Sequence, residues 1–222
     1  MRIRSLAIPA VALIAAGATA LPASANHSWG GYHWSRSGAV TVPVISHVTS
    51  DWSGNVSTAI SDWNKSAYVE SPLSTGDTSS RTRRRCSAVA GQIQVCNYSY
   101  GNNGWAGIAS ISITGGNHIT QATVKLNDTY EAGAPAAERQ GVACQEIGHD
   151  YGLDHQDEDF NNPNLGTCMD YTNDWSTNQH PNQHDYDELA TIYGHNDLAA
   201  AKGSGISRIK TGNTVTTITW AN

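Results

Sequence analysis

The segment 145-QEIGHDYGLDH-155 contains the residue types of a metal-dependent hydrolytic site. Residues four apart lie on the same face of a helix, so positions 145 and 149 could hold one ion between them. Glu146 is placed to act as a general base towards a water molecule at that ion. Gly152 allows the chain to turn sharply after the helix, and His155 follows three residues later. The spacing therefore predicts a metal site with His149 and His155 as ligands and Glu146 as the base.

This spacing resembles the zinc signature of the metzincin peptidases, H-E-x-x-H-x-x-G-x-x-H, which is followed by a methionine turn. The methionine candidate is Met169 in 167-TCMDYT-172, and Tyr171 lies two residues beyond it. The resemblance implies that the methionine turn forms an apolar floor under the metal and that Tyr171 contacts the metal or stabilises the oxyanion. Over residues 40–195 the layout is similar to a matrixin-like catalytic domain. It implies a zinc-dependent endopeptidase that hydrolyses peptide bonds through metal-activated water.

The segment departs from the signature at Gln145, where the first zinc histidine is expected. An amide oxygen is a weaker and harder ligand than an imidazole nitrogen. Three interpretations stay open. Gln145 binds zinc weakly; water or a distant histidine replaces it; or no metal binds, and the protein is a metal-poor pseudo-protease that acts as a secreted binding protein. The candidate replacement histidines, each more typical of a surface or packing role, are His118, His180, His184 and His195.

The four cysteines indicate two disulfides, because an even number in an exported protein is typical of such pairing. Three pairings are possible, and no C-x-x-C pair favours metal binding. We favour Cys86–Cys96 as a local loop and Cys144–Cys168 as a bridge. The second disulfide would fasten the predicted active-site helix to the methionine turn, where the ligands must converge.

Residues 1–25 have the pattern of a signal peptide, with Arg2 and Arg4 before an apolar stretch and Ala23-Ser24-Ala25 as the cleavage site. The protein is therefore expected to be secreted, with no membrane contact after cleavage. Cleavage removes two of the 13 basic residues and none of the 19 acidic ones, which leaves a net charge of about −8. This charge argues against a nucleic-acid partner. We expect a monomer that acts on protein or peptide substrates.

The remaining pattern predicts both strands and helices. Together with it, the resemblance implies an α+β fold with a twisted mixed sheet, an active-site helix, a methionine turn and a C-terminal helix. The predicted domains are a signal peptide at 1–25, a catalytic domain at 26–196 and a C-terminal tail at 197–222 with a β-prone end at 214–220. The expected strands are 40–48, a segment around Cys96, 107–114 and 119–127. The expected helices are one carrying Trp52 to Trp63 with Ser50 or Asp51 as cap, one from Pro135 to about Tyr151, and one from Asp185 with Glu188 completing a capping box. Residues 71–85 and 153–184 are expected to be loops.

Three further features have alternative interpretations. The aromatic residues within 26–38 could form a glycan- or surface-binding module. The acidic loop that contains Asp154, Asp157, Glu158 and Asp159 could bind calcium, although a solvated loop is favoured because the spacing is not that of an EF-hand. The arginine run at 81–85 is favoured as a solvated segment, with a processing site as the alternative.

Overall fold

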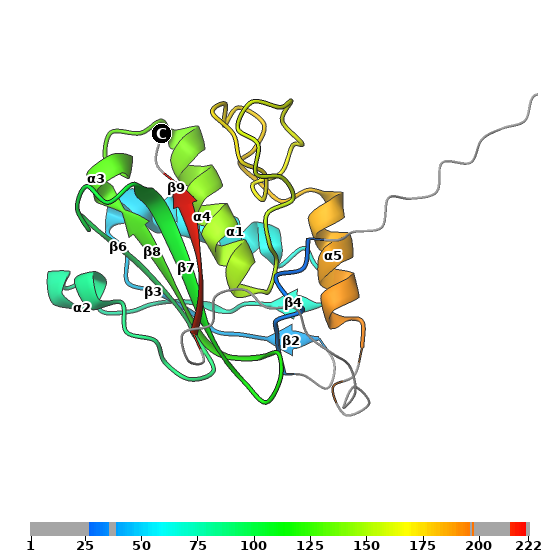
Figure 1. Cartoon of the computed structure of the whole chain (residues 1–222). Helices are drawn as coiled ribbons and strands as arrows, with labels where there is room; N and C mark the ends of the chain where they lie inside the picture. Colours follow the sequence, from blue (N-terminus) through cyan, green and yellow to red (C-terminus); the bar gives the residue numbers. More distant parts are fainter. Residues whose placement is uncertain (1–26, 36–38, 196, 198–213, 221–222) are drawn as a thin grey trace, which may run out of the picture.

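A mixed β-sheet forms the centre of the fold, which confirms the predicted α+β class (Figure 1). The computed structural model describes residues 27–35, 39–195, 197 and 214–220, so the predicted signal peptide lies outside the described residues. The strand order is β5-β3-β6-β8-β7-β9, and β1 pairs with one end of β8. The strands are β1 (His33–Trp34), β3 (Val44–Ser46), β5 (Leu73–Thr75), β6 (Ile93–Tyr98), β7 (Trp105–Thr114), β8 (His118–Asn127) and β9 (Thr214–Trp220).

The direction of the strands changes across the sheet. Strands β5, β3, β6 and β8 are parallel neighbours, whereas β7 is antiparallel to β8 and β9 is antiparallel to β7. The hairpin between β7 and β8 turns at Gly115 and Gly116, both of which have positive φ, as the glycine pair predicts. Because β9 lies within the predicted tail, the end of that tail belongs to the sheet.

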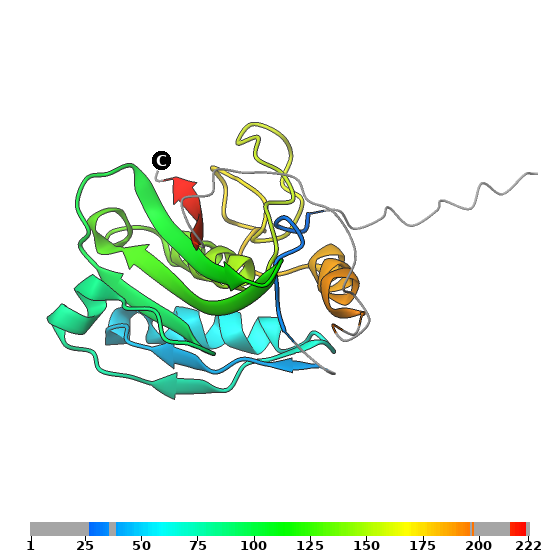
Figure 2. The same ribbon diagram turned by 60° about the horizontal axis from the view of Figure 1, so that its bottom comes forward.

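Two long helices cover one face of this twisted sheet (Figure 2). Helix α1 (Ser50–Trp63) packs against α4 (Ala136–Asp150), and α4 packs in turn on β7 and β8. Trp52 and Trp63 are fully buried between these layers. The indole Nε1 of Trp63 donates a hydrogen bond to the Cys144 carbonyl at 3.0 Å, which fixes the position of α1 beside α4. The other helices are α2 (Ser80–Arg85), α3 (Asp128–Glu131) and α5 (Gln183–Tyr193).

The segment expected as one strand at 40–48 is divided at Pro43. Residues Val40–Thr41 form β2, which pairs with β4 (Val69–Glu70) in a separate two-stranded sheet, whereas β3 joins the main sheet. Proline has no backbone N–H to donate, so it marks the point where the chain passes from one sheet to the other.

The prediction of a loop over 71–85 is wrong, because this segment contains β5 and α2. Strand β5 is exposed and pairs with β3 through its backbone, and Leu73 is its one apolar residue, so no apolar alternation marks it. Helix α2 begins after Ser79, whose side chain accepts from the Thr82 N–H, and it ends at Cys86, which a disulfide holds. Strand pairing, a polar helix cap and a disulfide therefore stabilise this segment. Hydrophobic periodicity reveals none of these contacts.

The predicted helix caps also differ. The cap of α1 is Thr49 rather than Ser50 or Asp51. At α5 the capping box is formed by Asn182 and Asp185, because the Asp185 carboxylate accepts from the Asn182 N–H at 2.7 Å. Glu188 is buried further along the helix, so the box expected between Asp185 and Glu188 does not form.

The N-terminal aromatic residues are part of the core. Trp29 and Trp34 are 3% and 5% exposed. The Trp34 indole donates to the Asp150 carbonyl at 2.8 Å, at the end of α4. A glycan-binding surface would need these rings in solvent, so the structure removes the basis of that alternative.

Glu131 in α3 makes the stability of the protein depend on pH. Its side chain is 1% exposed, and burial together with the nearby Glu138 raises its pKa from 4.5 to about 8. The folded state therefore retains this proton more strongly than the unfolded state, and the free energy of unfolding falls as the pH rises from about 4.5 to about 8. We expect Glu131→Gln to be more stable than the wild type at pH 8, by roughly 1–3 kcal/mol, and not at pH 4.5. Urea denaturation of both proteins between pH 4.5 and pH 8 would measure this difference in the free energy of unfolding. Exposed Glu70→Gln is the control, and parallel curves for wild type and Glu131→Gln would contradict the expectation.

Candidate metal centre

Helix α4 carries the predicted site and ends as the sequence indicates. Gly152 follows it with φ of 92°, a left-handed conformation that favours glycine. A Cβ at this position would also collide with the carbonyl oxygen of Tyr32, since the N-terminal segment passes directly over the turn. Trp29 N–H donates to the Gly152 carbonyl at 2.8 Å. The turn therefore has both a conformational and a packing reason for glycine.

His149 and His155 are brought together beyond this turn. Their Nε2 atoms lie 3.1 Å apart. The Nδ1 of His149 donates to the Leu153 carbonyl at 2.9 Å, and the Nδ1 of His155 faces the Glu158 carboxylate at 3.3 Å. Both acceptors favour a proton on Nδ1, so in the neutral rings the two Nε2 atoms present lone pairs to each other.

A shared cation fits this arrangement. Two ligand atoms on a tetrahedral zinc ion, each about 2.0–2.1 Å from the metal, are separated by about 3.4 Å. The 3.1 Å between the two Nε2 atoms is close to that value. Burial lowers the pKa of His149 well below 6.5, and the nearby His155 acts in the same direction. His149 is therefore the neutral imidazole that a metal requires.

The predicted methionine turn lies against this helix. Met169 is fully buried, and an added Cβ at Gly148 would lie 2.6 Å from its Sδ atom. The ring of Tyr171 lies 4.3 Å from that of His155, between centroids, and stacks on Phe160 at 4.8 Å. The turn thus places Met169 under α4 and Tyr171 beside the second histidine.

Both favoured disulfides are present. Cys144–Cys168 joins α4 to the residue before Met169, with 5.9 Å between the Cα atoms. Cys86–Cys96 links the end of α2 to β6. The first of these holds the two segments of the candidate site together.

Gln145 contacts the C-terminal strand. It is fully buried, and its Oε1 accepts a hydrogen bond from the Thr219 hydroxyl of β9 at 2.5 Å. That oxygen is the atom through which an amide binds a metal, and Thr219 occupies one of its two lone pairs. Its Nε2 has no hydrogen-bond partner among the described residues.

Glu146 is fully buried beside the same strand. A Cβ added at Gly107 of β7 would lie 2.6 Å from its Cγ, so the glycine leaves room for this side chain. Within the described chain, neither carboxylate oxygen has a hydrogen-bond partner of ordinary geometry. Burial raises its pKa to about 8, and the nearby polar groups of Thr219 and Ala109 oppose this shift only in part. A fully buried carboxyl group with a raised pKa is typical of a functional site, where a cation and a water molecule would offset its burial.

The four candidate replacement histidines contact other groups. His180 Nδ1 is 2.6 Å from the Asp62 carboxylate. The ring of His184 stacks on His27 at 4.9 Å. His118 and His195 both approach Asp197. None of these contacts is with His149 or His155.

The acidic loop after the helix hydrogen bonds to itself. The Asp157 carboxylate accepts from the Asp159 N–H at 2.6 Å, and the Asp159 carboxylate accepts from the Asn161 N–H at 2.9 Å. Such turns are typical of a solvated loop, and the structure gives calcium binding no support.

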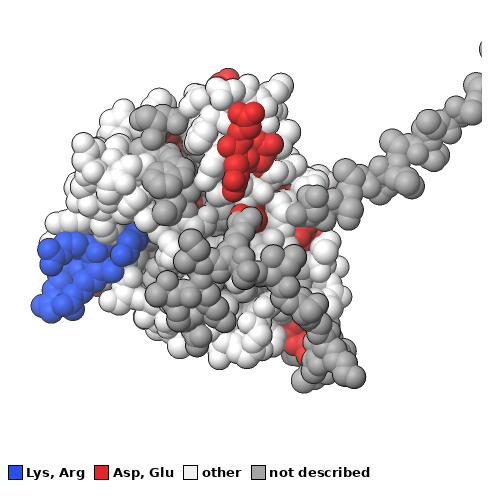
Figure 3. All heavy atoms as spheres, in the orientation of Figure 1, with Lys and Arg blue, Asp and Glu red and all other residues white. Residues whose placement is uncertain are grey.

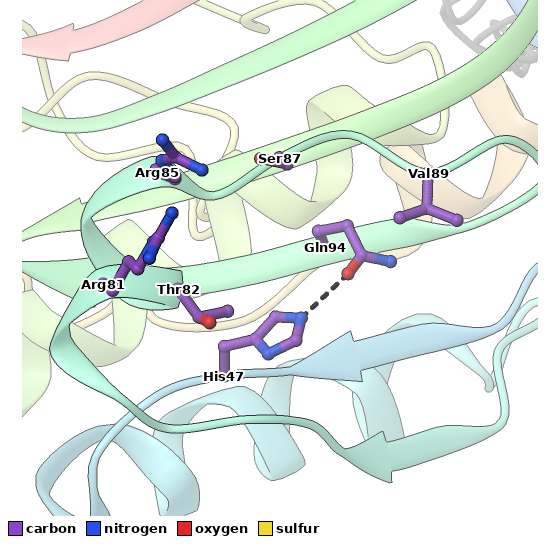
Figure 4. A pocket seen from close by; sticks show the side chains of 7 residues that line it. All are labelled: His47, Arg81, Thr82, Arg85, Ser87, Val89 and Gln94. Carbon is purple, nitrogen blue, oxygen red and sulfur yellow. Dashed lines mark hydrogen bonds between the residues drawn. The ribbon is translucent and has the colours of Figure 1, made fainter.

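A hollow of about 300 Å³ was not predicted as a site (Figure 4). Side chains alternate between the faces of a strand, and Gln94 in this hollow points away from the face that buries Ile93 and Val95. The hollow therefore lies across the sheet from α4. Exposed arginines of α2 make its rim basic (Figure 3). The hollow is lined by His47, Arg81, Thr82, Arg85, Ser87, Val89 and Gln94.

Comparison with known proteins shows distant structural similarity. No family model and no curated protein matches the sequence. Among solved structures, the chain is similar to myroilysin at 13% identity, with 76% of this chain and 98% of that chain covered and a TM-score of 0.46. A second myroilysin structure gives 13% identity, coverage of 81% and 87%, and a TM-score of 0.40. The chain is also similar to high choriolytic enzyme 1, a hatching enzyme zinc-protease from the medaka fish Oryzias latipes, at 12% identity. The match covers 73% of this chain and 94% of that chain, with a TM-score of 0.39. Similarity at this level identifies no function by itself.

Within the described residues, no helix is long and apolar enough to cross a membrane. The two disulfides are typical of an oxidising compartment.

Proposed function

We propose that this protein is a secreted zinc-dependent endopeptidase of the metzincin type. The observation that carries the proposal is the pair of Nε2 atoms of His149 and His155, which face each other across 3.1 Å beyond the helix that carries the buried Glu146. Imidazole nitrogens suit zinc. The substrates are proteins or peptides, and the active unit is a monomer without a nucleic-acid or membrane partner.

In this function His149 and His155 hold the metal, and Gln145 supplies a weak third ligand through its amide oxygen. When bound, a zinc ion polarises a peptide carbonyl and makes a water molecule more acidic. Glu146 takes the proton of the attacking water and passes it to the leaving amine. A divalent cation beside Glu146 would favour the carboxylate and offset the effect of burial on its pKa. Tyr171, next to His155, donates its hydroxyl proton towards the developing oxyanion.

The hydrogen bond from Thr219 to Gln145 favours one alternative. If the amide oxygen stays with Thr219, two histidines alone hold the metal, and the fold serves as a metal-poor pseudo-protease that binds other secreted proteins. The two functions differ in whether purified protein retains zinc at His149 and His155.

Metal analysis together with proteolysis tests the proposal. After dialysis, the mature wild type should contain one more equivalent of zinc than His149→Ala. It should cleave a denatured protein in a chelator-sensitive reaction that His149→Ala has lost. His47→Ala, on the opposite side of the sheet, is the matched control and should keep both properties. Equal zinc content in wild type and His149→Ala, together with no cleavage by either, would support the pseudo-protease instead.

A further inference from the structure

Three histidines surround one buried aspartate where β1, the first residue of β8 and the segment after α5 meet. The carboxylate belongs to Asp197, just after α5. One of its oxygens lies 3.2 Å from the Nε2 of His33 in β1 and 3.1 Å from the Nε2 of His195. The other oxygen lies 3.7 Å from the Nε2 of His118, the first residue of β8. The side chains of His33 and Asp197 are 10% and 7% exposed, and those of His118 and His195 are about a third exposed.

The orientation of His33 suits a metal ligand. Its Nδ1 donates to the Gly31 carbonyl at 2.8 Å, so in the neutral ring its Nε2 carries a lone pair towards the carboxylate. A second-sphere bond of this kind fixes the tautomer of a metal-binding histidine. The rings of His118 and His195 each lie 4.9 Å from that of His33, between centroids, and almost perpendicular to it.

We propose that His33, His118 and Asp197 hold a second zinc ion, separate from His149 and His155. Their ligand atoms all lie within 4.8 Å of one another. The separations of 3.2 and 3.7 Å between the two nitrogens and the carboxylate bracket the distance of about 3.4 Å between ligands on a tetrahedral zinc ion. His195 lies 3.1 Å from the same carboxylate but outside this group of three, so it is a neighbour of the carboxylate rather than a fourth ligand. The ion would tie β1 and the β7–β8 hairpin to the segment after α5. The rival explanation is a protonated histidine paired with Asp197 in the absence of metal.

Zinc stoichiometry separates these explanations. The dialysed wild type should contain two equivalents of zinc, and His118→Ala and Asp197→Asn should each contain one and retain cleavage. His149→Ala should also contain one but lose cleavage, and His47→Ala should contain two. Chelation should lower the Tm of the wild type more than that of His118→Ala. A zinc content unchanged by both His118→Ala and Asp197→Asn would overturn the site. If the variants fail to fold, the wild type alone decides: a zinc content of no more than one equivalent would overturn the second site.

A second inference rests on a separate observation, the position of β9. This strand pairs along the free edge of β7 in antiparallel register, from Ser112 opposite Thr214 to Trp105 opposite Trp220. Addition of a strand to a sheet edge is a general way for a protein to bind an extended peptide. The side chains of β9 that face α4 include Val215, which is 7% exposed, and Thr219, which is 3% exposed and contacts Gln145. The strand thereby covers both Gln145 and Glu146.

We infer that β9 inhibits the enzyme from within, by occupying the path along which an extended peptide would reach Glu146. This inference depends on the proposed peptidase function. A substrate must displace β9 from β7. This displacement also breaks the hydrogen bond from Thr219 and so frees the Gln145 oxygen. The ladder and the Thr219 hydrogen bond hold the strand in place, so the resting activity of the full chain is low.

A charge placed on the buried side of β9 tests this inference in the full chain. Val215→Asp should raise kcat/KM on a peptide about tenfold, because an unpaired buried carboxylate opposes docking of the strand. Thr214→Asp, exposed on the same strand, is the matched control and should behave as the wild type. A synthetic peptide of residues 214–222 should inhibit Val215→Asp. Equal, chelator-sensitive activity in all three chains would overturn inhibition by β9 but leave the peptidase intact. Activity in none of them would instead remove the peptidase function.

Discussion

Replacing Glu146 with glutamine is expected to reduce kcat/KM about 10²–10⁴-fold while the protein keeps its zinc. The amide has nearly the shape of the carboxyl group, so it fits the space that Gly107 leaves beside β7. It cannot accept the proton of the attacking water at neutral pH. Burial opposes a charge at this position, so the amide should also be tolerated or stabilising in the absence of metal.

Measurements of cleavage rate and zinc content on the same preparations would check this expectation. Glu138→Gln is the matched control, because Glu138 lies on the first turn of the same helix and away from the histidines. It should retain wild-type activity. If Glu146→Gln cleaves as fast as the control, Glu146 is not the base. If it loses zinc as well as activity, Glu146 supports the ligands rather than the proton transfer.

The local part of the site could be predicted from the sequence because short-range geometry determines it. A spacing of four residues fixes the helix face of positions 145 and 149, and Gly152 fixes the turn that delivers His155. The structure brings His149 and His155 to 3.1 Å, as that spacing requires. The strands that flank Gly115 and Gly116 were predictable for the same reason, since alternation and a glycine turn are local signals.

Contacts between distant segments were not predictable. Thr219 and Gln145 are 74 residues apart, and His33 and Asp197 are 164 residues apart. Their meeting depends on strand order: β9 pairs with β7, and β1 pairs with the start of β8. The sequence showed only separate histidines and a β-prone end, each of which has an ordinary surface or packing role. The basic hollow beside α2 was missed because the arginine run was expected to be a loop.

Replacing Gln145 with histidine is expected to raise zinc affinity at His149 and His155 about 10–100-fold. An imidazole nitrogen is a stronger zinc donor than an amide oxygen, and the helix already places position 145 on the face of His149. The change also removes the acceptor of the Thr219 hydroxyl, so one contact that holds β9 over the site is lost. Tighter zinc binding and easier displacement of β9 should both increase cleavage of peptides. Competition with a chelator of known affinity would measure the first effect, and initial rates at saturating zinc would measure the second.

Two further substitutions separate the effect of zinc affinity from the effect of β9 displacement. Thr219→Val frees the amide oxygen without a new ligand, so it should raise zinc affinity only slightly while it raises activity. Gln145→Ala removes the oxygen, so it should bind zinc more weakly than the wild type if that oxygen is a ligand. Equal zinc affinity in Gln145→His, Gln145→Ala and the wild type would show that position 145 does not face the metal. In that case two histidines alone would hold the ion, which is the condition of the pseudo-protease. Under the proposed function, position 145 and the strand that covers it therefore decide whether the protein cuts peptides or only binds them.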